Sequence, residues 1–227
     1  MKTLLKPSDV SPQDFYKILI GSVLPRPIAW VSTLSKSGVD NLAPFSFFTV
    51  ASANPPVLCF APAIRSLRPE NKSIGTEKDT LVNVRETKEF VVNIVSRHLV
   101  NAMNQTSAEY DLGVSEFEMA GLTKTPSELV KPKCVAESFV NMECKLYQIL
   151  EIGTEPMGGS LVLGEIVAVH LDDQVYKDGK IDIEVLDPIA RLGGLWYSST
   201  ADRFELPRPT LPVSSGESDS QTKRNPL

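Results

Sequence analysis

The fold is decided by residues 25–56, which begin P-R-P-I-A-W-V-S-T and end N-L-A-P-F-S-F-F-T-V-A-S-A-N-P-P. Two runs rich in β-forming residues flank a polar K-S-G turn at residues 36–38, and this pattern predicts a β-hairpin. The second run contains Pro44, which has no amide hydrogen to donate to a neighbouring strand. Pro44 therefore indicates a sheet edge or a bulge rather than a regular central strand.

Residues 43–49 place this proline among two hydroxyl side chains and three phenylalanines. Backbone groups left unpaired beside aromatic faces suit a flat heterocycle rich in amide groups, such as a flavin. The alternative interpretation is a buried strand with a single proline defect. The local composition leaves both interpretations open.

The chain of 227 residues is long enough for one sizeable hydrophobic core. We expect a single domain over residues 1–204. Residues 205–227 are polar and rich in proline and serine, so we expect a tail that is either disordered or draped over a partner. The sequence contains neither G-x-G-x-x-G nor G-x-x-x-x-G-K-[ST], so a dinucleotide-binding βαβ domain or a phosphate-binding loop is a poor fit.

The composition is that of an ordinary globular protein, with 42% hydrophobic and 22% charged residues. A formal net charge of -5 gives no reason to expect nucleic acid or an anionic membrane as a partner. The chain has no apolar run near the roughly 18 residues of a membrane span, no signal-peptide pattern and no C-x-x-C pair among its cysteines. These features predict a cytoplasmic protein. With two histidines, a His-rich metal site is not expected.

The spacing of apolar residues predicts short helices between several strands. One helix should begin after Ser11 and pack on the body of the protein, because serine followed by proline and an acidic residue is a helix start. A second helix should begin at Asp79, and a third should cover residues 97–108. Strands are expected over residues 57–61, 89–95 and 161–169.

Residues 140–150 alternate apolar side chains with Asn141, Glu143 and Lys145. This period of two is typical of a long, half-buried antiparallel strand. Six or more strands, joined by hairpins and short helices, favour a β-barrel with a few helices over an alternating βαβ sheet.

Seven motifs span about residues 20–200: P-R-P-I-A-W-V-S-T, N-L-A-P-F-S-F-F, N-P-P, K-D-T-L-V-N, E-F-V-V-N-I, G-E-I-V-A-V-H and P-I-A-R-L-G-G. Together, and in this order, they resemble the flavin reductase-like FMN-binding family. The resemblance implies a mainly β protein with short helices, built as an FMN-binding split β-barrel. It also implies a homodimer with FMN bound noncovalently near the subunit interface.

The function implied by this resemblance is that of an NAD(P)H-dependent flavin oxidoreductase. NADH or NADPH would be the electron donor, hydride would pass from nicotinamide to flavin N5, and free flavin or a monooxygenase component would be the acceptor. Two alternatives remain. One is an FMN-binding electron-transfer or flavin-carrier protein without significant NAD(P)H turnover, and the other is a barrel that has lost flavin and serves as an interaction module.

The resemblance also implies where the cofactor lies. Residues 41–49 would lie under the flavin ring, with backbone groups near its carbonyl oxygens and nitrogens. Arg65 would bind the phosphate, because its fork of donors matches phosphate oxygens. The full set of expected cofactor contacts is Ser32, Thr33, Asn41, Ala43, Pro44, Phe45, Ser46, Phe47, Thr49, Arg65, Lys78, Asp79, Thr80, Asn83, Arg191 and Tyr197.

His170 ends the G-E-I-V-A-V-H motif, where the resemblance implies a residue near the open face of the flavin. There it would act catalytically by steadying the nicotinamide amide or a proton of the reduced flavin. The alternative interpretation is a histidine at a strand end that hydrogen-bonds to a loop.

Two features depart from the short flavin reductases of the family. Those proteins carry an N-G-M-T-V-S-S type stretch where this chain has N-L-A-P-F-S-F-F. This chain also has a longer C-terminal part, from about residue 175, that would cover the nicotinamide site. The departures bear more on reductase activity than on FMN binding.

Overall fold

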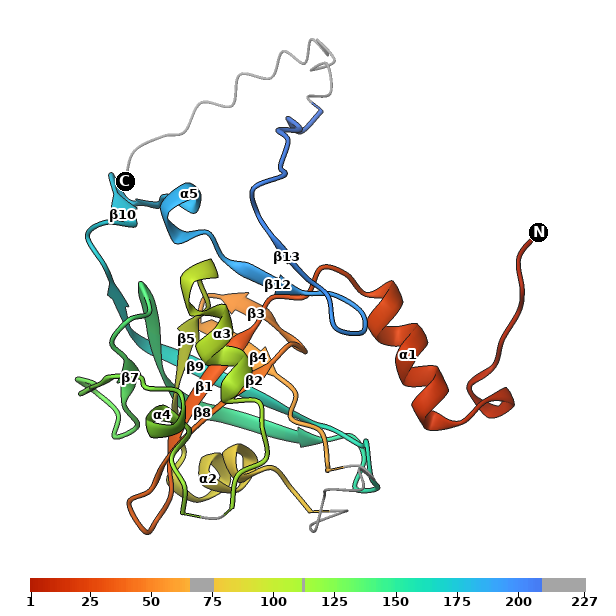
Figure 1. Ribbon diagram of the computed structural model, residues 1–227, viewed down its shortest axis with the longest axis horizontal. Coiled ribbons are helices and arrows are strands. Elements are labelled where there is room, and N and C mark those ends of the chain that lie inside the picture. The colour runs from red at the N-terminus through yellow and green to blue at the C-terminus, as the bar shows by residue number, and fades with distance from the viewer. Residues whose placement is uncertain (66–75, 112, 210–227) are drawn as a thin grey trace, which may run out of the picture.

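The computed structural model describes residues 1–65, 76–111 and 113–209. Its main feature is an antiparallel seven-stranded sheet in the order β2-β1-β5-β8-β9-β4-β3 (Figure 1). The prediction of a mainly β protein is confirmed, and residues 210–227 of the predicted tail lie outside the described residues. The strands are β1 (Ala29–Leu34), β2 (Asp40–Phe45), β3 (Phe48–Ala53), β4 (Pro56–Phe60), β5 (Glu89–Ile94), β8 (Val140–Glu151) and β9 (Ser160–Leu171).

Short helices and two-stranded ribbons surround this sheet. Helices α2, α3 and α4 contact β1 or β2, so they gather beside the strand that carries Pro44. The helical segments are η1 (Pro7–Asp9), α1 (Pro12–Ser22), α2 (Asp79–Thr87), η2 (Arg97–Leu99), α3 (Val100–Gln105), α4 (Glu116–Met119) and α5 (Ile183–Leu186). The ribbons pair β6 (Lys124–Thr125) with β7 (Cys134–Val135), β10 (Tyr176–Lys177) with β11 (Lys180–Ile181), and β12 (Ile189–Arg191) with β13 (Tyr197–Ser199).

Strands β2 and β3 are the two edges of the sheet, and Ser46 and Phe47 alone separate them in the chain. Pro44 lies opposite Trp30 of β1, on the edge strand β2. The edge position predicted from the missing amide donor is therefore confirmed. A single buried strand with a proline defect does not describe this stretch, because the chain passes here from one edge of the sheet to the other.

Strand β1 is buried on both faces. Val31 packs with Phe60 and Phe90 in a cluster on one face of the sheet. Trp30 packs with Phe117 in a second cluster on the other face, with α3 and α4. Each cluster removes large apolar side chains from water, which stabilises the fold by roughly 1.5–3 kcal/mol for each fully buried side chain.

The ring of Phe90 packs directly on the backbone of β9. A Cβ atom added to Gly164 would lie 2.8 Å from Cε1 of Phe90 and closer still to Cζ. We therefore expect Gly164→Ala to lower the free energy of unfolding by about 1–3 kcal/mol, because the ring or the strand must shift. Urea unfolding followed by tryptophan fluorescence measures this change.

Gly21 is the matched control, because a Cβ atom added there meets nothing within 4 Å. Gly21→Ala should be neutral or should stabilise α1 by at most about 1 kcal/mol. Equal destabilisation by the two substitutions would contradict the close approach of Phe90 to β9.

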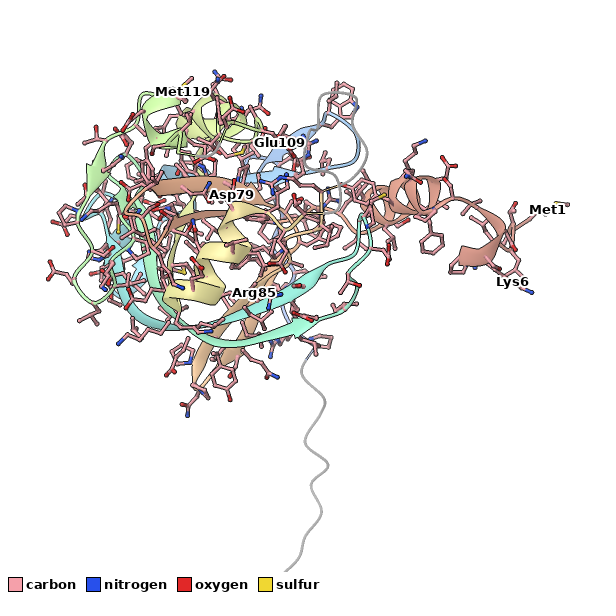
Figure 2. All side chains as sticks on the ribbon, turned by 90° about the horizontal axis from the view of Figure 1, so that it is seen from below. Met1, Lys6, Asp79, Arg85, Glu109 and Met119 are labelled. Carbon is pink, nitrogen blue, oxygen red and sulfur yellow. The ribbon has the colours of Figure 1, made fainter. Side chains whose placement is uncertain are left out.

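Helix α1 begins as predicted but does not pack as predicted. Ser11 Oγ accepts a hydrogen bond from the Asp14 amide at 3.1 Å and so caps the helix. None of the α1 side chains, all of which the structure describes, is buried. Figures 1 and 2 show α1 extending away from the barrel, with Met1 and Lys6 beyond its far end. The expected packing on the body of the protein is wrong over most of the helix.

The burial of side chains along strand β8 differs from the alternation predicted for residues 140–150. The alternation implies that Asn141 and Glu143 face solvent, but both are buried. Asn141 Nδ2 donates to Asn93 Oδ1 at 2.7 Å, and the Glu143 carboxylate accepts hydrogen bonds from backbone amides. Leu150, on the apolar side of the pattern, is exposed. Period-two patterning fails here because buried polar groups that are hydrogen-bonded can replace apolar ones.

Candidate functional site

Two adjoining cavities lie beside the end of β2. Their volumes are about 90 Å³ and about 350 Å³. The larger one alone falls in the range of roughly 300–1,000 Å³ that is typical of small-molecule sites. Both cavities are lined by Pro44, Phe45, Arg65, Lys78, Ser107 and Glu109.

The floor of the smaller cavity is a network of buried polar side chains. Asn41 Oδ1 accepts hydrogen bonds from Thr80 Oγ1 at 2.8 Å and from Thr33 Oγ1 at 3.3 Å. Asn83 Nδ2 donates to Thr33 Oγ1 at 3.0 Å. These bonds join β1, β2 and the first turns of α2, so the floor is held rigid before any ligand binds.

Glu116 completes this floor from α4. Its Oε1 accepts a hydrogen bond from Asn41 Nδ2 at 2.7 Å, and its Oε2 accepts one from the Leu42 amide at 2.9 Å. Glu116 is buried, and burial raises the pKa of its carboxyl although the hydrogen bond from the Leu42 amide acts in the opposite direction. The carboxylate thus fixes the orientation of the Asn41 amide and the position of β2.

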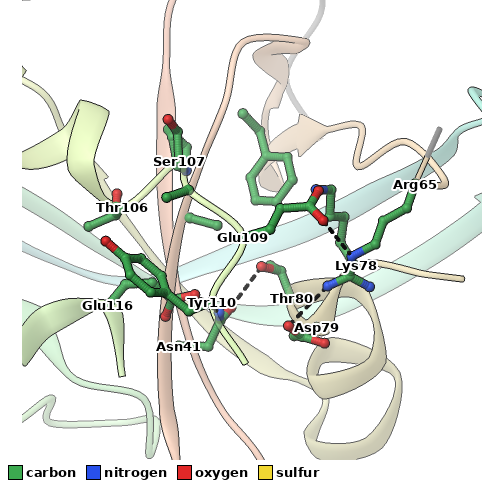
Figure 3. Close-up of a pocket in the computed structure, with 14 residues that line it drawn as sticks. Asn41, Arg65, Lys78, Asp79, Thr80, Thr106, Ser107, Glu109, Tyr110 and Glu116 are labelled. Atoms are coloured by element: carbon green, nitrogen blue, oxygen red, sulfur yellow. Dashed lines mark hydrogen bonds and ion pairs between the residues drawn. The ribbon is translucent and has the colours of Figure 1, made fainter. Parts of the chain in front are cut away.

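Two cations converge above this floor, as Figure 3 shows. Arg65 Nη2 lies 3.1 Å from Asp79 Oδ2, and Lys78 Nζ lies 2.6 Å from Glu109 Oε1. Arg65 Nε lies 3.7 Å from Glu109 Oε2. Only 11% of the Arg65 side chain is exposed. A guanidinium and an ammonium group in one partly buried pocket are suited to bind phosphate oxygens.

Aromatic side chains line the larger cavity on the side of α1. Tyr16 of α1 and Phe47 have ring centroids 6.4 Å apart and are both exposed. Arg26 holds the C-terminal end of α1 beside this cavity. Its Nη1 donates hydrogen bonds to the carbonyl oxygens of Ile20 and Val23 at 2.8 Å and 3.0 Å. The end of the cavity beside α1 therefore presents flat apolar side chains, and the end at Arg65 and Lys78 presents positive charge.

Taken together, the lining residues fit a planar ligand that carries a phosphate. The polar end holds the donors of Arg65 and Lys78 over the Asn41 floor, and the aromatic end holds Phe45 and Phe47. Strand β2 is an edge of the sheet, Pro44 has no amide hydrogen to donate there, and Ala43, Pro44 and Phe45 line the smaller cavity. This is the arrangement that the flavin interpretation requires.

Comparison with known proteins identifies the family. Residues 20–189 match the family model of the flavin reductase like domain. The chain belongs to the flavin reductase-like family. A protein from Halalkalibacterium halodurans is 42% identical over 210 residues, which cover 91% of this chain and 97% of that protein. The resemblance drawn from the seven motifs is thus confirmed.

Solved structures of the flavin reductase-like family share the fold. The structure of nitrilotriacetate monooxygenase component B from Bacillus cereus is 36% identical with a TM-score of 0.84, covering 91% of this chain and 99% of that chain. The 2-nitrobenzoate 2-nitroreductase NbaA from Pseudomonas fluorescens is 33% identical with a TM-score of 0.78, covering 94% and 100% of the two chains. These likenesses confirm the predicted split barrel.

Most of the cofactor contacts expected from this family converge on the two cavities. The lining includes, from that set, Asn41, Ala43, Pro44, Phe45, Ser46, Phe47, Arg65, Lys78, Asp79 and Thr80. Thr33 and Asn83 lie beneath them in the polar floor. The fold therefore brings together residues that the sequence places between positions 33 and 83.

Arg191 and Tyr197 lie in a separate cavity of about 630 Å³ on the other side of Pro44 and Ser46. The guanidinium carbon of Arg191 is 4.5 Å from the centroid of the Tyr197 ring, a cation–π arrangement. Ser107 lines both this cavity and the cavity of about 90 Å³. Within one chain these two residues thus flank the site and do not touch the charged cluster.

Three expected site residues are placed elsewhere in the single chain. Ser32 is fully buried, and its hydroxyl donates to the carbonyl oxygen of Lys133. Thr49 is exposed on the edge strand β3. His170 Nε2 lies 2.5 Å from Glu143 Oε1, on the neighbouring strand β8. The structure does not bring these three side chains to the cavities.

Sequence reasoning missed Glu109, Tyr110 and Glu116, which line the smaller cavity. They lie in residues that the sequence shows as a loop followed by a short element, without a recognisable motif. The one available signal was the S-E-F-E stretch at residues 115–118, whose serine and acidic residues are typical of a helix start.

Glu116 should make stability depend on pH. Because its folded pKa is raised above the ordinary value of 4.5, its stabilising contribution is complete below that pH and is lost as the pH rises through the folded pKa. Glu116→Gln resembles the protonated form. Relative to the wild type, the free energy of unfolding of this variant should therefore increase as the pH rises above 4.5. Urea titrations at several pH values measure this difference.

Glu118→Gln is the control for that experiment, because this neighbouring carboxylate is 76% exposed. Its difference from the wild type should not change with pH over the same range. A pH-independent difference for Glu116→Gln as well would contradict the raised pKa.

Two features are absent from the described residues: a helix that could cross a membrane and a cluster of metal ligands. Among the helices in the described parts of the chain, none is long and apolar enough to cross a membrane. Across residues 1–65, 76–111 and 113–209, no group of three or more His, Cys, Asp or Glu side chains is arranged to hold a metal ion.

Proposed function

We propose that this protein is an FMN-dependent oxidoreductase that takes electrons from NADH or NADPH. The observation that carries the proposal is the convergence of Arg65 and Lys78 with the Asn41 floor and the open edge of β2, in a chain of the flavin reductase-like family. Two relatives with solved structures and at least 33% identity bear the names of a monooxygenase component B and a nitroreductase. Both names fit reactions in which a flavin carries electrons.

The chain's own residues would hold and orient FMN. Arg65 and Lys78 would bind the phosphate, and Asn41 with Thr80 would meet the ribityl hydroxyls. Backbone groups of residues 43–47 would contact the ring, where hydrogen bonds adjust its electronic properties. Bound FMN would supply the redox chemistry, accepting hydride from nicotinamide at N5. No protein nucleophile is needed for this reaction, so positioning and electrostatics are the protein's contribution.

The proposal includes a homodimer with the site near the subunit interface. Apolar side chains are exposed near the site. Tyr16 and Phe47 line the larger of the first two cavities and are 42% and 43% exposed, and Leu195, which lines the cavity of about 630 Å³, and the next residue, Trp196, are 90% and 75% exposed. A surface of this kind is typical of a protein–protein contact. His170 is held by Glu143 within one chain, so its proposed role near the nicotinamide requires a second subunit to bring it to the flavin.

The electron acceptor belongs to the same proposal. Free flavin or a monooxygenase component would receive the electrons, and a cytoplasmic location fits the free thiols of all three cysteines. The alternative is an FMN-binding electron-transfer or flavin-carrier protein without significant NAD(P)H turnover.

An anaerobic visible spectrum of the purified protein tests the proposal. Oxidised flavin should give a band at about 450 nm, and NADH or NADPH should bleach it within seconds. A band that bleaches only with dithionite would favour the electron carrier. Absence of the band after addition of FMN would contradict both flavin functions and favour an interaction module.

A further inference from the structure

The carboxylate of Glu109 occupies the cation pair that the proposed function assigns to phosphate. Its Oε1 lies 2.6 Å from Lys78 Nζ, and its Oε2 lies 3.7 Å from Arg65 Nε. Figure 3 shows the Glu109 carboxylate beside Lys78, above the start of α2. Two oxygens of one anion thus face both cations, as two oxygens of a phosphate would.

Among the described side chains of this cluster, Arg65 and Lys78 contribute two positive charges, and Asp79 and Glu109 contribute two negative ones. A phosphate monoester adds a charge of about -1.5 to -2 at pH 7. Beside these two carboxylates the phosphate would meet like charges in a partly buried pocket, which is unfavourable. A phosphate must therefore compete with the carboxylates for the two cations.

The two carboxylates differ in their place in the fold and in the cations they face. Asp79 is the first residue of α2, whose next residues Thr80 and Leu81 are buried against the barrel. Glu109 lies outside regular structure, between α3 and α4. The side chains of Asp79 and Glu109 are 36% and 28% exposed, so exposure does not separate them. Among the ion pairs of the described residues, Glu109 faces both cations, whereas Asp79 faces Arg65, so Glu109 is the carboxylate that competes most directly with a phosphate.

We propose that Glu109 is a specificity-determining residue, whose carboxylate takes the donors of Arg65 and Lys78 until a phosphate displaces it. This inference rests on the proposed binding of FMN. It assigns the site to flavins with a terminal phosphate monoester. Riboflavin has no phosphate, so it cannot replace the contacts that the two cations lose when Glu109 moves away. The cost of displacing Glu109 weakens FMN binding but keeps weaker anions out of the site.

The full-length Glu109→Gln variant tests this inference, with the dissociation constants of FMN and riboflavin measured by quenching of flavin fluorescence. The substitution keeps the shape of the side chain and removes its charge. FMN should bind the variant about 3- to 10-fold more tightly than it binds the wild type, whereas riboflavin affinity should change by less than about twofold. Glu118→Gln, which removes an exposed carboxylate from α4, should leave both constants unchanged.

Inorganic phosphate provides a second measurement on the same proteins. It should compete with FMN several-fold more effectively in Glu109→Gln than in the wild type, because it enters the same cation pair. Unchanged or weaker FMN binding by the variant would overturn the inference, and so would an equal gain for riboflavin. If neither protein binds FMN, the proposed function fails as well. If the wild type binds FMN and Glu109→Gln binds it with the same dissociation constant, only the role of Glu109 fails.

Discussion

Replacement of Glu143 by alanine should lower the free energy of unfolding by about 3–5 kcal/mol. Glu143 is fully buried in β8, and its two oxygens accept hydrogen bonds from the amides of Glu128, Leu129 and Val130 at 2.7 Å, 2.7 Å and 3.1 Å. Its Oε1 also contacts His170 Nε2. Alanine would leave these donors without an acceptor, and unsatisfied buried donors are costly. Urea unfolding at pH 7 measures the loss.

The same carboxylate predicts a dependence on pH. Burial acts to raise the pKa of Glu143, but the hydrogen bonds from His170 and the backbone amides outweigh it and lower the pKa. A folded pKa below the unfolded one means that the stabilisation is present above the ordinary value of 4.5 and is lost as the pH falls through the folded pKa. The difference between the wild type and Glu143→Ala should therefore shrink below pH 4.5.

Glu165→Ala is the matched control, because it removes an exposed carboxylate from the adjacent strand β9. It should change the free energy of unfolding by less than about 0.5 kcal/mol. His170→Gln should give a smaller loss than Glu143→Ala, because the three amides keep their acceptor. Comparable small effects from Glu143→Ala and Glu165→Ala would show that the buried carboxylate does not hold the loop at residues 128–130.

Local signals explain how much of the fold was predictable. The K-S-G turn, the cap at Ser11 and the missing amide of Pro44 each act over a few residues, and the structure confirms all three. The packing of α1 was not predictable in this way. An amphipathic helix pattern shows that one face is apolar, but it does not show whether the barrel or another molecule covers that face.

The residues of the candidate site were likewise only partly predictable from the sequence. Lys78 lies in the K-D-T-L-V-N motif and Arg65 lies in the segment before it, where the resemblance implies phosphate binding, so their expected roles follow from the resemblance. Glu116 meets Asn41 from 75 positions along the chain, and Glu109 meets Lys78 from 31 positions away. Neither acid has a motif of its own, because its function depends on a partner that only the folded chain brings near. Buried or paired carboxylates of this kind escape periodicity, which treats every charge as a surface residue.

Replacement of Arg65 by alanine should weaken FMN binding by about 10- to 100-fold, the effect expected for the loss of charge-assisted hydrogen bonds to a phosphate. The Arg65 side chain is 11% exposed and lies beside the start of α2, so it would meet a phosphate in a partly desolvated pocket. Fluorescence titration measures the dissociation constants of FMN and riboflavin. The loss should appear with FMN alone, because riboflavin has no phosphate for Arg65 to bind.

Two further variants separate charge from geometry. Arg65→Lys keeps the positive charge but loses the forked donors, so its FMN affinity should lie between those of the wild type and Arg65→Ala. Arg97→Ala removes an arginine whose ion pair with Asp187 is largely exposed, and it should leave both dissociation constants unchanged. If Arg65→Ala lowers the affinities of FMN and riboflavin equally, Arg65 supports the shape of the cavity and the phosphate is bound elsewhere. A selective loss with FMN identifies Arg65 as the residue that recognises the phosphate.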